Sequence, residues 1–375
     1  MSLEKVIGWI LGALGLATIF EIQSLEASTG SEAFRSEIGP TFSAPIKYNK
    51  KLFFLSTSGK FFESDLDLKK GKLLYETRLP TMSGPTLIGD DIWFGEGLHA
   101  DKKSKIYAFN LKSKKLSFQM PINGHVQRDF LGDGENIYFG AGPGGLVALD
   151  KNTKKILWKK DKIPQGKIHI DSNIVVYKQQ VCVASVYGVK GIICFNKISG
   201  DLVQTYPLSH SPKGEISLSG SRLYGMATEA NMVKMEWKKE GHLYVIDLAK
   251  GKKTLSQKFR GYNFFRPYLL NVDQVFMTLS TGDFLIFDLR TGKVDYVGEF
   301  PEPFISSPFV IPGVKKELCS IGIMGQLLCF QRKGKTYVMS RKQRFFESPI
   351  GIVKSREMGG KFYFPSRIGY FMLDP

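Results

Sequence analysis

The 375-residue sequence contains only four cysteines and five histidines, and neither residue type forms a recognisable catalytic or metal-binding motif. The short spacing typical of zinc ligands is missing between the histidines, which are His99, His125, His169, His210 and His242. Nucleotide-binding loops and nucleophile triads are absent as well. The first cysteine is Cys182, which excludes a lipid-modified cysteine near the N-terminus. We therefore predict no catalytic, cofactor-binding or metal-binding residues and expect a protein that is not an enzyme.

Acidic residues are scarce relative to basic ones. The 52 Lys and Arg against 35 Asp and Glu give a formal net charge of +17, which would suit an anionic partner. The basic residues are spread along the chain in small turn clusters, such as Lys69-Lys70 and Lys114-Lys115, so a solvated basic surface is favoured over a nucleic-acid site. A hydrophobic content of 43% excludes wholesale disorder and predicts a globular core.

Near the N-terminus, an uncharged apolar segment, residues 6–20, lies between a weakly basic start and a short polar stretch. Fifteen residues is long for the core of a signal peptide and short for a membrane span of about 20 residues. Cleavage after Ala27 is compatible with the sequence. We therefore expect residues 1–27 to be a signal peptide or an uncleaved N-terminal membrane anchor. Either one predicts a periplasmic protein, secreted or tethered to the inner membrane, with membrane contact only through this segment.

A four-strand pattern recurs in residues 28–375. The best copies, residues 144–158, 241–255 and 282–296, have a third strand close to apolar-x-small-apolar-Asp, a tight turn, and a bulky residue four positions after the turn; four further copies match less well. The turns fall 40 to 51 residues apart, at Gly71, Lys114, Lys154, Gly200, Gly251, Gly292 and Gly334. This period is typical of the four-stranded blades of a β-propeller. The bulky residues are expected to cover the outer edges of the blades; they include Tyr75, Phe118, Trp158 and Tyr296.

An eighth repeat is split between the two ends of the sequence. Residues 346–375 supply three strands, and residues 28–34 match the missing turn and fourth strand, since Phe34 follows Gly30 as Tyr296 follows Gly292. Pairing these segments removes free sheet edges. The predicted fold is therefore all-β: an eight-bladed β-propeller of four-stranded antiparallel blades, closed by an N-terminal outer strand.

The repeats resemble the pyrroloquinoline-quinone-like repeat family. The resemblance is clearest at Ala148-Leu149-Asp150 with Trp158, and at Asp288 with Thr291-Gly292. It implies a monomeric, non-catalytic periplasmic scaffold for protein–protein interaction in the cell envelope, such as outer-membrane protein assembly. A quinoprotein-type dehydrogenase or a small-ligand-binding propeller is the alternative. Enzymes of that class use adjacent cysteines and a tryptophan platform, whereas this chain has no adjacent cysteines and only four tryptophans.

Two insertions between second and third strands are the predicted partner site. They are residues 95–105 in the second blade and 227–240 in the fifth, and both belong to the face that carries the connections between blades. Apolar side chains in such loops mark a partner site unless the loop folds back over its own blade. The predicted contacts to an envelope protein are Met232, Val233, Met235, Trp237, Leu98 and His99.

Polar residues near the first strands should line the central channel, where they either solvate it or bind a small ligand. These residues are Arg128, Asp129, His169, Asp171 and Arg266.

The four cysteines form two pairs that are symmetric about hairpin turns. Cys182 and Cys194 flank Gly188, and Cys319 and Cys329 flank Met324. Each pair should face across adjacent antiparallel strands at a separation that a disulfide accepts. Disulfides within the hairpins are one interpretation; buried free thiols that pack as small apolar groups are the other.

Overall fold

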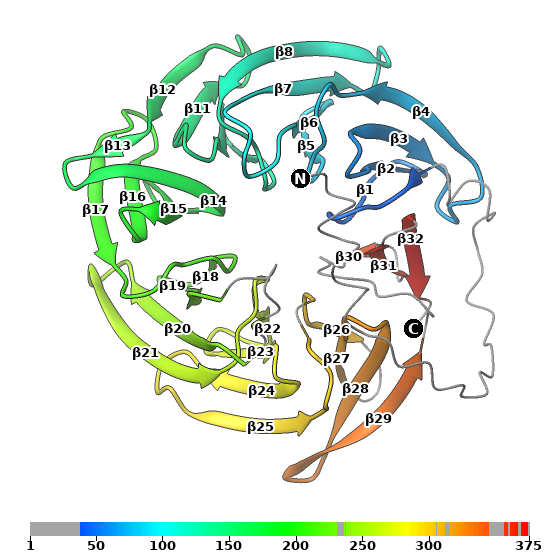
Figure 1. The fold of residues 1–375 in the computed structure, drawn as a ribbon, viewed down its shortest axis with the longest axis vertical. Helices are drawn as coiled ribbons and strands as arrows, with labels where there is room; N and C mark the ends of the chain where they lie inside the picture. The colour runs from blue at the N-terminus through cyan, green and yellow to red at the C-terminus, as the bar shows by residue number, and fades with distance from the viewer. Residues whose placement is uncertain are drawn as a thin grey trace.

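The computed structural model describes residues 38–230, 236, 238–304, 306–311, 316–344, 356–358, 361–366 and 369–373. The described elements are antiparallel β-strands, and no helix in these ranges is long and apolar enough to cross a membrane. The strands form successive sheets that follow one another around a ring (Figure 1). The prediction of an all-β propeller is confirmed.

Seven sheets contain four or five strands each, and we number them as blades 1 to 7 in chain order. Blade 1 contains β1 (Ile46–Tyr48), β2 (Lys51–Leu55), β3 (Lys60–Ser64) and β4 (Gly71–Glu76). Blade 2 contains β5 (Thr86–Ile88), β6 (Asp91–Gly95), β7 (Lys103–Asn110) and β8 (Lys115–Asn123). Blade 3 contains β9 (Leu131–Asp133), β10 (Asn136–Gly140), β11 (Leu146–Asp150) and β12 (Ile156–Lys160). Blade 4 contains β13 (Lys162–Ile163), β14 (Gly166–Tyr177), β15 (Gln180–Gly188), β16 (Gly191–Asn196) and β17 (Leu202–Pro207).

The remaining blades repeat the same order. Blade 5 contains β18 (Ser217–Ser219), β19 (Arg222–Thr228), β20 (Glu240–Asp247) and β21 (Lys252–Arg260). Blade 6 contains β22 (Tyr268–Leu269), β23 (Gln274–Thr278), β24 (Asp283–Asp288) and β25 (Val294–Glu299). Blade 7 contains β26 (Phe309–Ile311), β27 (Glu317–Ile321), β28 (Gln326–Lys333) and β29 (Thr336–Arg344). A further three-stranded sheet contains β30 (Arg356–Met358), β31 (Lys361–Ser366) and β32 (Gly369–Leu373).

The three-stranded sheet lies between blade 7 and blade 1 (Figure 1). Its Phe364 ring packs 5.3 Å from the ring of Phe309 in blade 7. On the other side, the Tyr363 hydroxyl donates a 2.9 Å hydrogen bond to the carbonyl of Leu66 and packs in the core of blade 1. The first and last of the described sheets therefore meet through β31. Residues 29–37, predicted to add an outer strand here, lie outside the described residues.

The turn between the third and fourth strands follows from the Asp or Asn that ends the third strand. In blade 6 the Asp288 carboxylate accepts the backbone N–H groups of Arg290 and Thr291, and Gly292 takes a left-handed conformation with φ of 77°. Six of the seven predicted turn residues, including Lys114 and Lys154, have positive φ. Blade 1 is the exception. Its left-handed residue is Leu68, and Gly71 instead begins β4.

The predicted cover of outer edges holds for Trp158 and is wrong for Tyr296. Trp158 is 8% exposed and lies opposite Ala148, next to a register shift between Ala148 and Leu149. Blade 6 has Ile286 at the alanine position, and its register shift falls between Phe284 and Leu285. The earlier shift buries Val297 and leaves Tyr296 69% exposed. The position of this β-bulge decides which residue of the outer strand faces inward.

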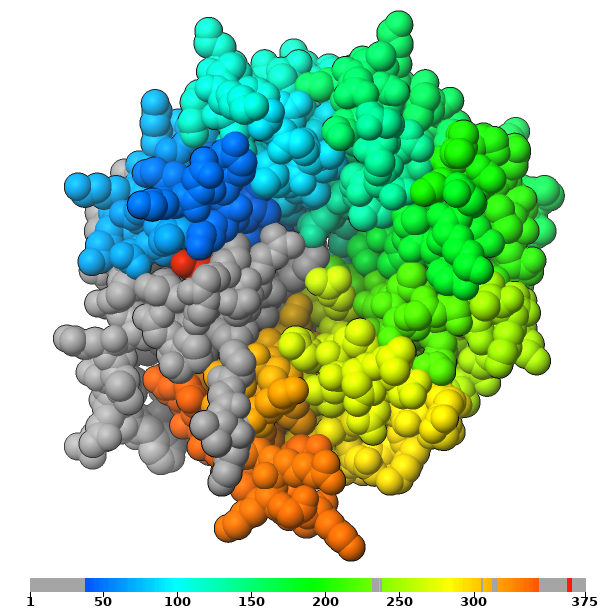
Figure 2. Space-filling model, turned by 180° about the vertical axis from the view of Figure 1, so that it is seen from behind, coloured from blue at the N-terminus to red at the C-terminus, as the bar shows by residue number. Residues whose placement is uncertain are grey.

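Neighbouring blades pack through large apolar side chains. For example, the rings of Phe61 and Phe94 are 5.0 Å apart between blades 1 and 2, and those of Phe284 and Phe330 are 4.8 Å apart between blades 6 and 7. The space-filling view from the other side shows continuous contact from the blue blade through green to orange (Figure 2). The core is therefore a series of interfaces between sheets, which places polar groups and loops at the two ends of the ring.

Candidate functional site

The connections between second and third strands all emerge at one end of the ring, together with the connections between blades, because consecutive strands run antiparallel. We call this end the loop face. It carries the insertion between β6 and β7 in blade 2, the short turn between β15 and β16 in blade 4, and the insertion between β19 and β20 in blade 5. Both predicted partner loops thus belong to the same face.

The blade 2 insertion folds against the ring and is held by backbone hydrogen bonds. The N–H of Gly97 donates to the carbonyl of Pro80 at 2.8 Å, and the N–H of Leu98 donates to the Asp101 carboxylate at 2.6 Å. Gly97 has φ of 101°, and a side chain there would meet His125. Leu98 is consequently partly buried, whereas His99 is exposed and turns towards blades 3 and 4.

Three histidines converge on one carboxylate at the loop face. His125 Nε2 lies 3.0 Å from Asp171 Oδ1, while His99 Nδ1 and His169 Nε2 lie 3.0 and 2.8 Å from Asp171 Oδ2. The three imidazole rings form a triangle with centroid separations of 5.2 to 5.5 Å. The Tyr187 ring packs 5.1 Å from His169 and 5.4 Å from His99. We call His99, His125, His169 and Asp171 the histidine cluster.

The histidine cluster is largely removed from water. The side chain of His125 is fully buried, those of Asp171 and His169 are 11% and 15% exposed, and that of His99 is half exposed. Burial alone would raise the pKa of Asp171, but hydrogen bonds from the three histidines hold this pKa well below its ordinary value. Burial alone would lower the pKa of His125, yet its bonds to Asp171 and to the Asp101 carbonyl leave it raised.

One ligand atom from each residue of the histidine cluster lies within 4.8 Å of all the others, which is an arrangement able to hold a metal ion. A second such group in the described part of the chain contains Glu317, Cys319 and Cys329. In that group the two sulfur atoms are bonded to each other. Of these two groups, only the histidine cluster has donor atoms that are not used in a disulfide.

A second polar group lies beside the histidine cluster. The Arg128 Nε donates to the backbone carbonyl of Asp171 at 3.1 Å, and its Nη1 lies 3.6 Å from the buried Glu215 carboxylate. The guanidinium also lies 6.0 Å from the centroid of the Phe265 ring. Arg128 thus links the connection before blade 3 to blades 4 and 5. Because it binds the backbone oxygen of Asp171, the carboxylate of that residue is left to the histidines.

The structure brings together residues that the sequence assigned to different tasks. His99, predicted as a partner contact, meets His169 and Asp171, predicted as channel-lining residues. Arg266 contacts the same Glu215 carboxylate as Arg128, through its backbone N–H at 3.4 Å, and Asp129 lies against Gly84. The predicted contacts Met232, Val233, Met235 and Trp237 lie outside the described residues.

Sequence reasoning did not predict the histidine cluster. Its residues come from a loop, from a connection between blades and from β14, at positions 99, 125, 169 and 171. No local motif contains them. The one signal that could have found them is their shared place in the repeats, since each lies at the loop-face end of its blade.

A basic groove of about 540 Å³ lies between the outer parts of blades 2 and 3. Apolar side chains, among them Met120 and Ile156, form part of its lining. Four cationic residues also line it, namely Arg78, Lys103, Lys105 and Lys159. The groove brings four cationic side chains and apolar surface together, which suits an anionic partner.

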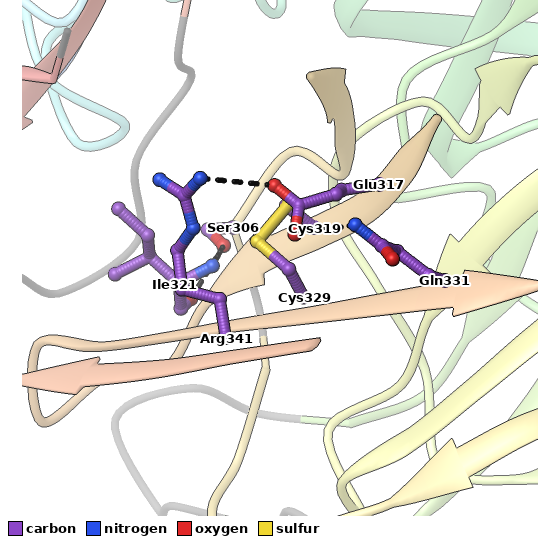
Figure 3. Close-up of a disulfide and its surroundings, with 7 residues drawn as sticks. All are labelled: Ser306, Glu317, Cys319, Ile321, Cys329, Gln331 and Arg341. Carbon is purple, nitrogen blue, oxygen red and sulfur yellow. Dashed lines mark hydrogen bonds and ion pairs between the residues drawn. A yellow bond between two sulfur atoms is a disulfide. The ribbon is translucent and has the colours of Figure 1, made fainter. Parts of the chain in front are cut away.

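Disulfides join Cys182 to Cys194 in blade 4 and Cys319 to Cys329 in blade 7. The α-carbons are 4.1 and 4.2 Å apart, close to the spacing of a non-hydrogen-bonded antiparallel pair. All four cysteines are fully buried. Beside the second bridge, Glu317 accepts a hydrogen bond from Gln331 at 3.2 Å and pairs with Arg341 at 3.1 Å (Figure 3).

Comparisons with known proteins agree with this fold. Residues 20–295 match the model of a family described as outer membrane protein assembly factor BamB. No curated protein sequence matches the chain significantly. The structure is similar to that of BamB from Moraxella catarrhalis, with a TM-score of 0.66 and 13% identity over 88% of this chain and 92% of that one.

Two other solved structures show how widely the architecture is shared. The computationally designed Ika8 protein has a TM-score of 0.68 and 10% identity, over 90% of this chain and 97% of that one. The quinohemoprotein alcohol dehydrogenase ADHIIG from Pseudomonas putida HK5 has a TM-score of 0.58 and 10% identity, over 78% of this chain and 64% of that one. At these identities the likeness concerns the fold alone.

Proposed function

Because the chain belongs to the family of the outer membrane protein assembly factor BamB, we propose that it is a non-catalytic scaffold that binds another protein of the cell envelope. The family match over residues 20–295 is the observation that carries this proposal. A rigid ring of packed sheets suits the role, because it presents loops from several blades on one surface. The proposal includes a periplasmic location, reached through residues 1–27 as a signal peptide or inner-membrane anchor.

The enzyme alternative has weaker support. The similarity to the quinohemoprotein dehydrogenase is one of fold at 10% identity, and this chain aligns with only 64% of that protein. The cysteines of the chain bond across hairpins at sequence separations of 12 and 10, whereas the family resemblance associates the enzymes with adjacent cysteines. A scaffold without quinone accounts for these features more simply.

The partner surface that we propose is the loop face between blades 2 and 5. The base of the blade 5 insertion is anchored to blade 4 by the ion pair between Glu229 and Lys190 at 2.9 Å. Lys213 Nζ donates to the carbonyl of Ala230 at 2.8 Å on the same insertion. Between the two insertions, the Tyr187 side chain is 45% exposed and offers an aromatic contact. Residues 231–237 extend this surface in the proposal.

Crosslinking from the loop face tests the partner proposal. A photoreactive residue in place of Trp237 or Met235 should capture a component of the outer-membrane assembly machinery in cells, identified by mass spectrometry. The matched control is the same residue in place of Tyr296, which is exposed on the outer edge of blade 6. Equal capture from both positions would argue against a specific loop-face partner. A quinone bound to the purified protein, together with alcohol-oxidising activity, would instead favour the quinoprotein dehydrogenase alternative.

We also propose that the ring has eight blades, with residues 29–37 as the outer strand beside β32. In support of this, the sheet β30–β32 has three strands where blades 1 to 7 each have four or five. Deleting residues 31–37 should then lower the urea midpoint of cooperative unfolding, because an apolar sheet edge is left uncovered. Deleting Ser28 alone, which precedes the proposed strand, is the control. An unchanged midpoint after the longer deletion would contradict the closure.

A further inference from the structure

The structure assigns a divalent transition-metal site, of the kind that binds Zn²⁺, to His99, His125, His169 and Asp171. This inference is independent of the proposed scaffold function. Three imidazole nitrogens and one carboxylate oxygen are a common ligand set for such ions. The four donor atoms all lie within 4.8 Å of one another and come from three separate segments of the chain.

The distances suit a tetrahedral ion. The three histidine nitrogens lie 2.8 to 3.0 Å from the oxygens of Asp171. Ligand atoms around Zn²⁺, with bonds of about 2.0 to 2.1 Å, are roughly 3.3 Å apart in a tetrahedron. Binding would therefore require the nitrogen–carboxylate contacts to open by a few tenths of an ångström and the histidine nitrogens, which lie within 4.8 Å of one another, to gather around the ion. The half-exposed His99 is the ligand that can move to accommodate the ion, since it belongs to a loop.

The hydrogen bonding of His125 gives a second reason. Its Nδ1 lies 3.2 Å from the backbone carbonyl of Asp101, and a carbonyl can only accept, so Nδ1 must carry a proton. In the neutral ring the opposite Nε2 then has a lone pair, and this lone pair faces Asp171 Oδ1 at 3.0 Å. Two lone pairs repel each other at this distance. The contact therefore needs a cation between the two atoms, either a second proton or a metal ion.

A carbonyl that fixes the tautomer of a ligand histidine is the usual outer partner in metal sites. The surroundings of the cluster are consistent with a bound cation. Arg128 donates to the backbone oxygen of Asp171, so the Asp171 carboxylate is left to the histidines. Tyr187 packs over His99 and His169 and limits access of water.

The ion would tie three parts of the ring together. His99 belongs to the blade 2 insertion, His125 to the connection before blade 3, and His169 and Asp171 to β14 of blade 4. A metal bound to all of them would fix the insertion on the loop face. Because such an ion binds only the folded chain, it should also stabilise the protein.

Metal titration of the purified protein tests this site directly. The protein is treated with a chelator, kept without reductant so that its disulfides stay intact, and titrated with Zn²⁺ by calorimetry and with Co²⁺ by visible absorption. We expect one equivalent of either ion to bind per chain, with the Co²⁺ spectrum of a tetrahedral nitrogen–oxygen site. Zn²⁺ should also raise the thermal unfolding midpoint of the protein.

Two variants and a matched control complete the test. His99→Ala and His169→Gln should each weaken Zn²⁺ binding by at least about 10- to 100-fold and remove the Zn²⁺-dependent rise in the midpoint. His210→Gln, outside the cluster, should leave both unchanged. The exposed position of His99 lets its variant fold, which an unchanged midpoint without metal verifies. Equal Zn²⁺ binding by all three variants, or no stoichiometric binding by the folded parent protein, would overturn the site. The latter result would leave a proton as the cation between His125 and Asp171.

Discussion

Blades 2 and 3 differ from blades 4 and 7 at one register position, where the second strand faces the third. An aromatic ring lies opposite alanine in the first two, and two cysteines face each other in the other two; the pairs are Trp93 with Ala108, Tyr138 with Ala148, Cys182 with Cys194, and Cys319 with Cys329. All eight residues are at most 1% exposed. The same space in the blade can thus be filled by a large ring over a small residue or by two small residues joined covalently.

The two solutions depend on different conditions. The aromatic pair relies on apolar burial and dispersion contacts, which are insensitive to redox state. The disulfide buries less apolar volume than the aromatic pair but restricts the conformations of the unfolded chain. It persists only in an oxidising compartment. A chain that uses both is suited to the periplasm proposed above. Blades 4 and 7 should therefore respond to reductant, whereas blades 2 and 3 should not.

Removing the ring of Trp93 should have the largest effect. Trp93 packs 5.6 Å from Phe118 in its own blade and 5.9 Å from Phe130 in blade 3, so Trp93→Ala leaves a cavity at a blade interface. We expect the free energy of unfolding, measured with urea, to fall by about 3–5 kcal/mol. A loss below about 1 kcal/mol would mean that neighbouring blades refill the space and that the aromatic pair is dispensable.

Removing one disulfide should cost somewhat less. In the double variant Cys182→Ala, Cys194→Ala the bridge that spans 12 residues is lost and the strands keep a small pair. We expect a loss of about 2–3 kcal/mol in the free energy of unfolding under oxidising conditions. The parent protein in excess reductant should lose a similar amount from this bridge, while the effect of Trp93→Ala should be the same with or without reductant.

Thiol counting on the denatured, unreduced protein checks the premise of that comparison. We expect no free thiols, and peptide mapping should recover only the bridges within hairpins. Four free thiols would show that blades 4 and 7 fill the position with unbonded sulfur atoms. Bridges between Cys182 or Cys194 and the cysteines of blade 7 would contradict the register of both hairpins.

The turn after the third strand should be equally important in both kinds of blade. Asn110 in blade 2 and Asn196 in blade 4 each accept two backbone N–H groups of the following turn. Replacing either by alanine should lower the free energy of unfolding by about 1 kcal/mol, because these groups then lose their partner. Aspartate should retain the stability at position 196, whereas at position 110 it would lose the hydrogen bond that the Asn110 amide donates to Asp91 and place two carboxylates side by side. A larger loss at Asn110 is expected from its additional hydrogen bond to Asp91, so a larger loss at Asn196 would show that the disulfide supports the neighbouring turn.

The smallest effect is expected at Tyr296. Its side chain is 69% exposed, so Tyr296→Ala should change the free energy of unfolding by no more than about 0.5 kcal/mol. The contrast with Trp158, which occupies the corresponding place in blade 3, isolates the effect of the displaced β-bulge.

The repeat allowed the fold to be predicted because each blade encodes its own strands, turn and small residue within one period. The positive φ at Lys114 and Gly292, and the pairing of cysteines about Gly188, follow from that local pattern. The histidine cluster could not be predicted in the same way. Its geometry depends on how three blades are rotated about the ring and on the path of one insertion, neither of which leaves a local spacing. The outcome at Tyr296 depended on a bulge whose position is likewise set by packing.

The contact between Tyr363 and Leu66 joins residues 297 positions apart, and this separation along the sequence affects the rate of folding. A chain delivered from its N-terminus can complete blades 2 to 6 from short-range contacts long before residue 363 arrives. One side of blade 1, with Leu52 and Phe54, then lacks its cover until Tyr363 has been synthesised. Such late, long-range closure slows folding and prolongs exposure of apolar surface. The propeller should therefore refold slowly, with its last phase sensitive to holding chaperones and its earlier phases insensitive to them.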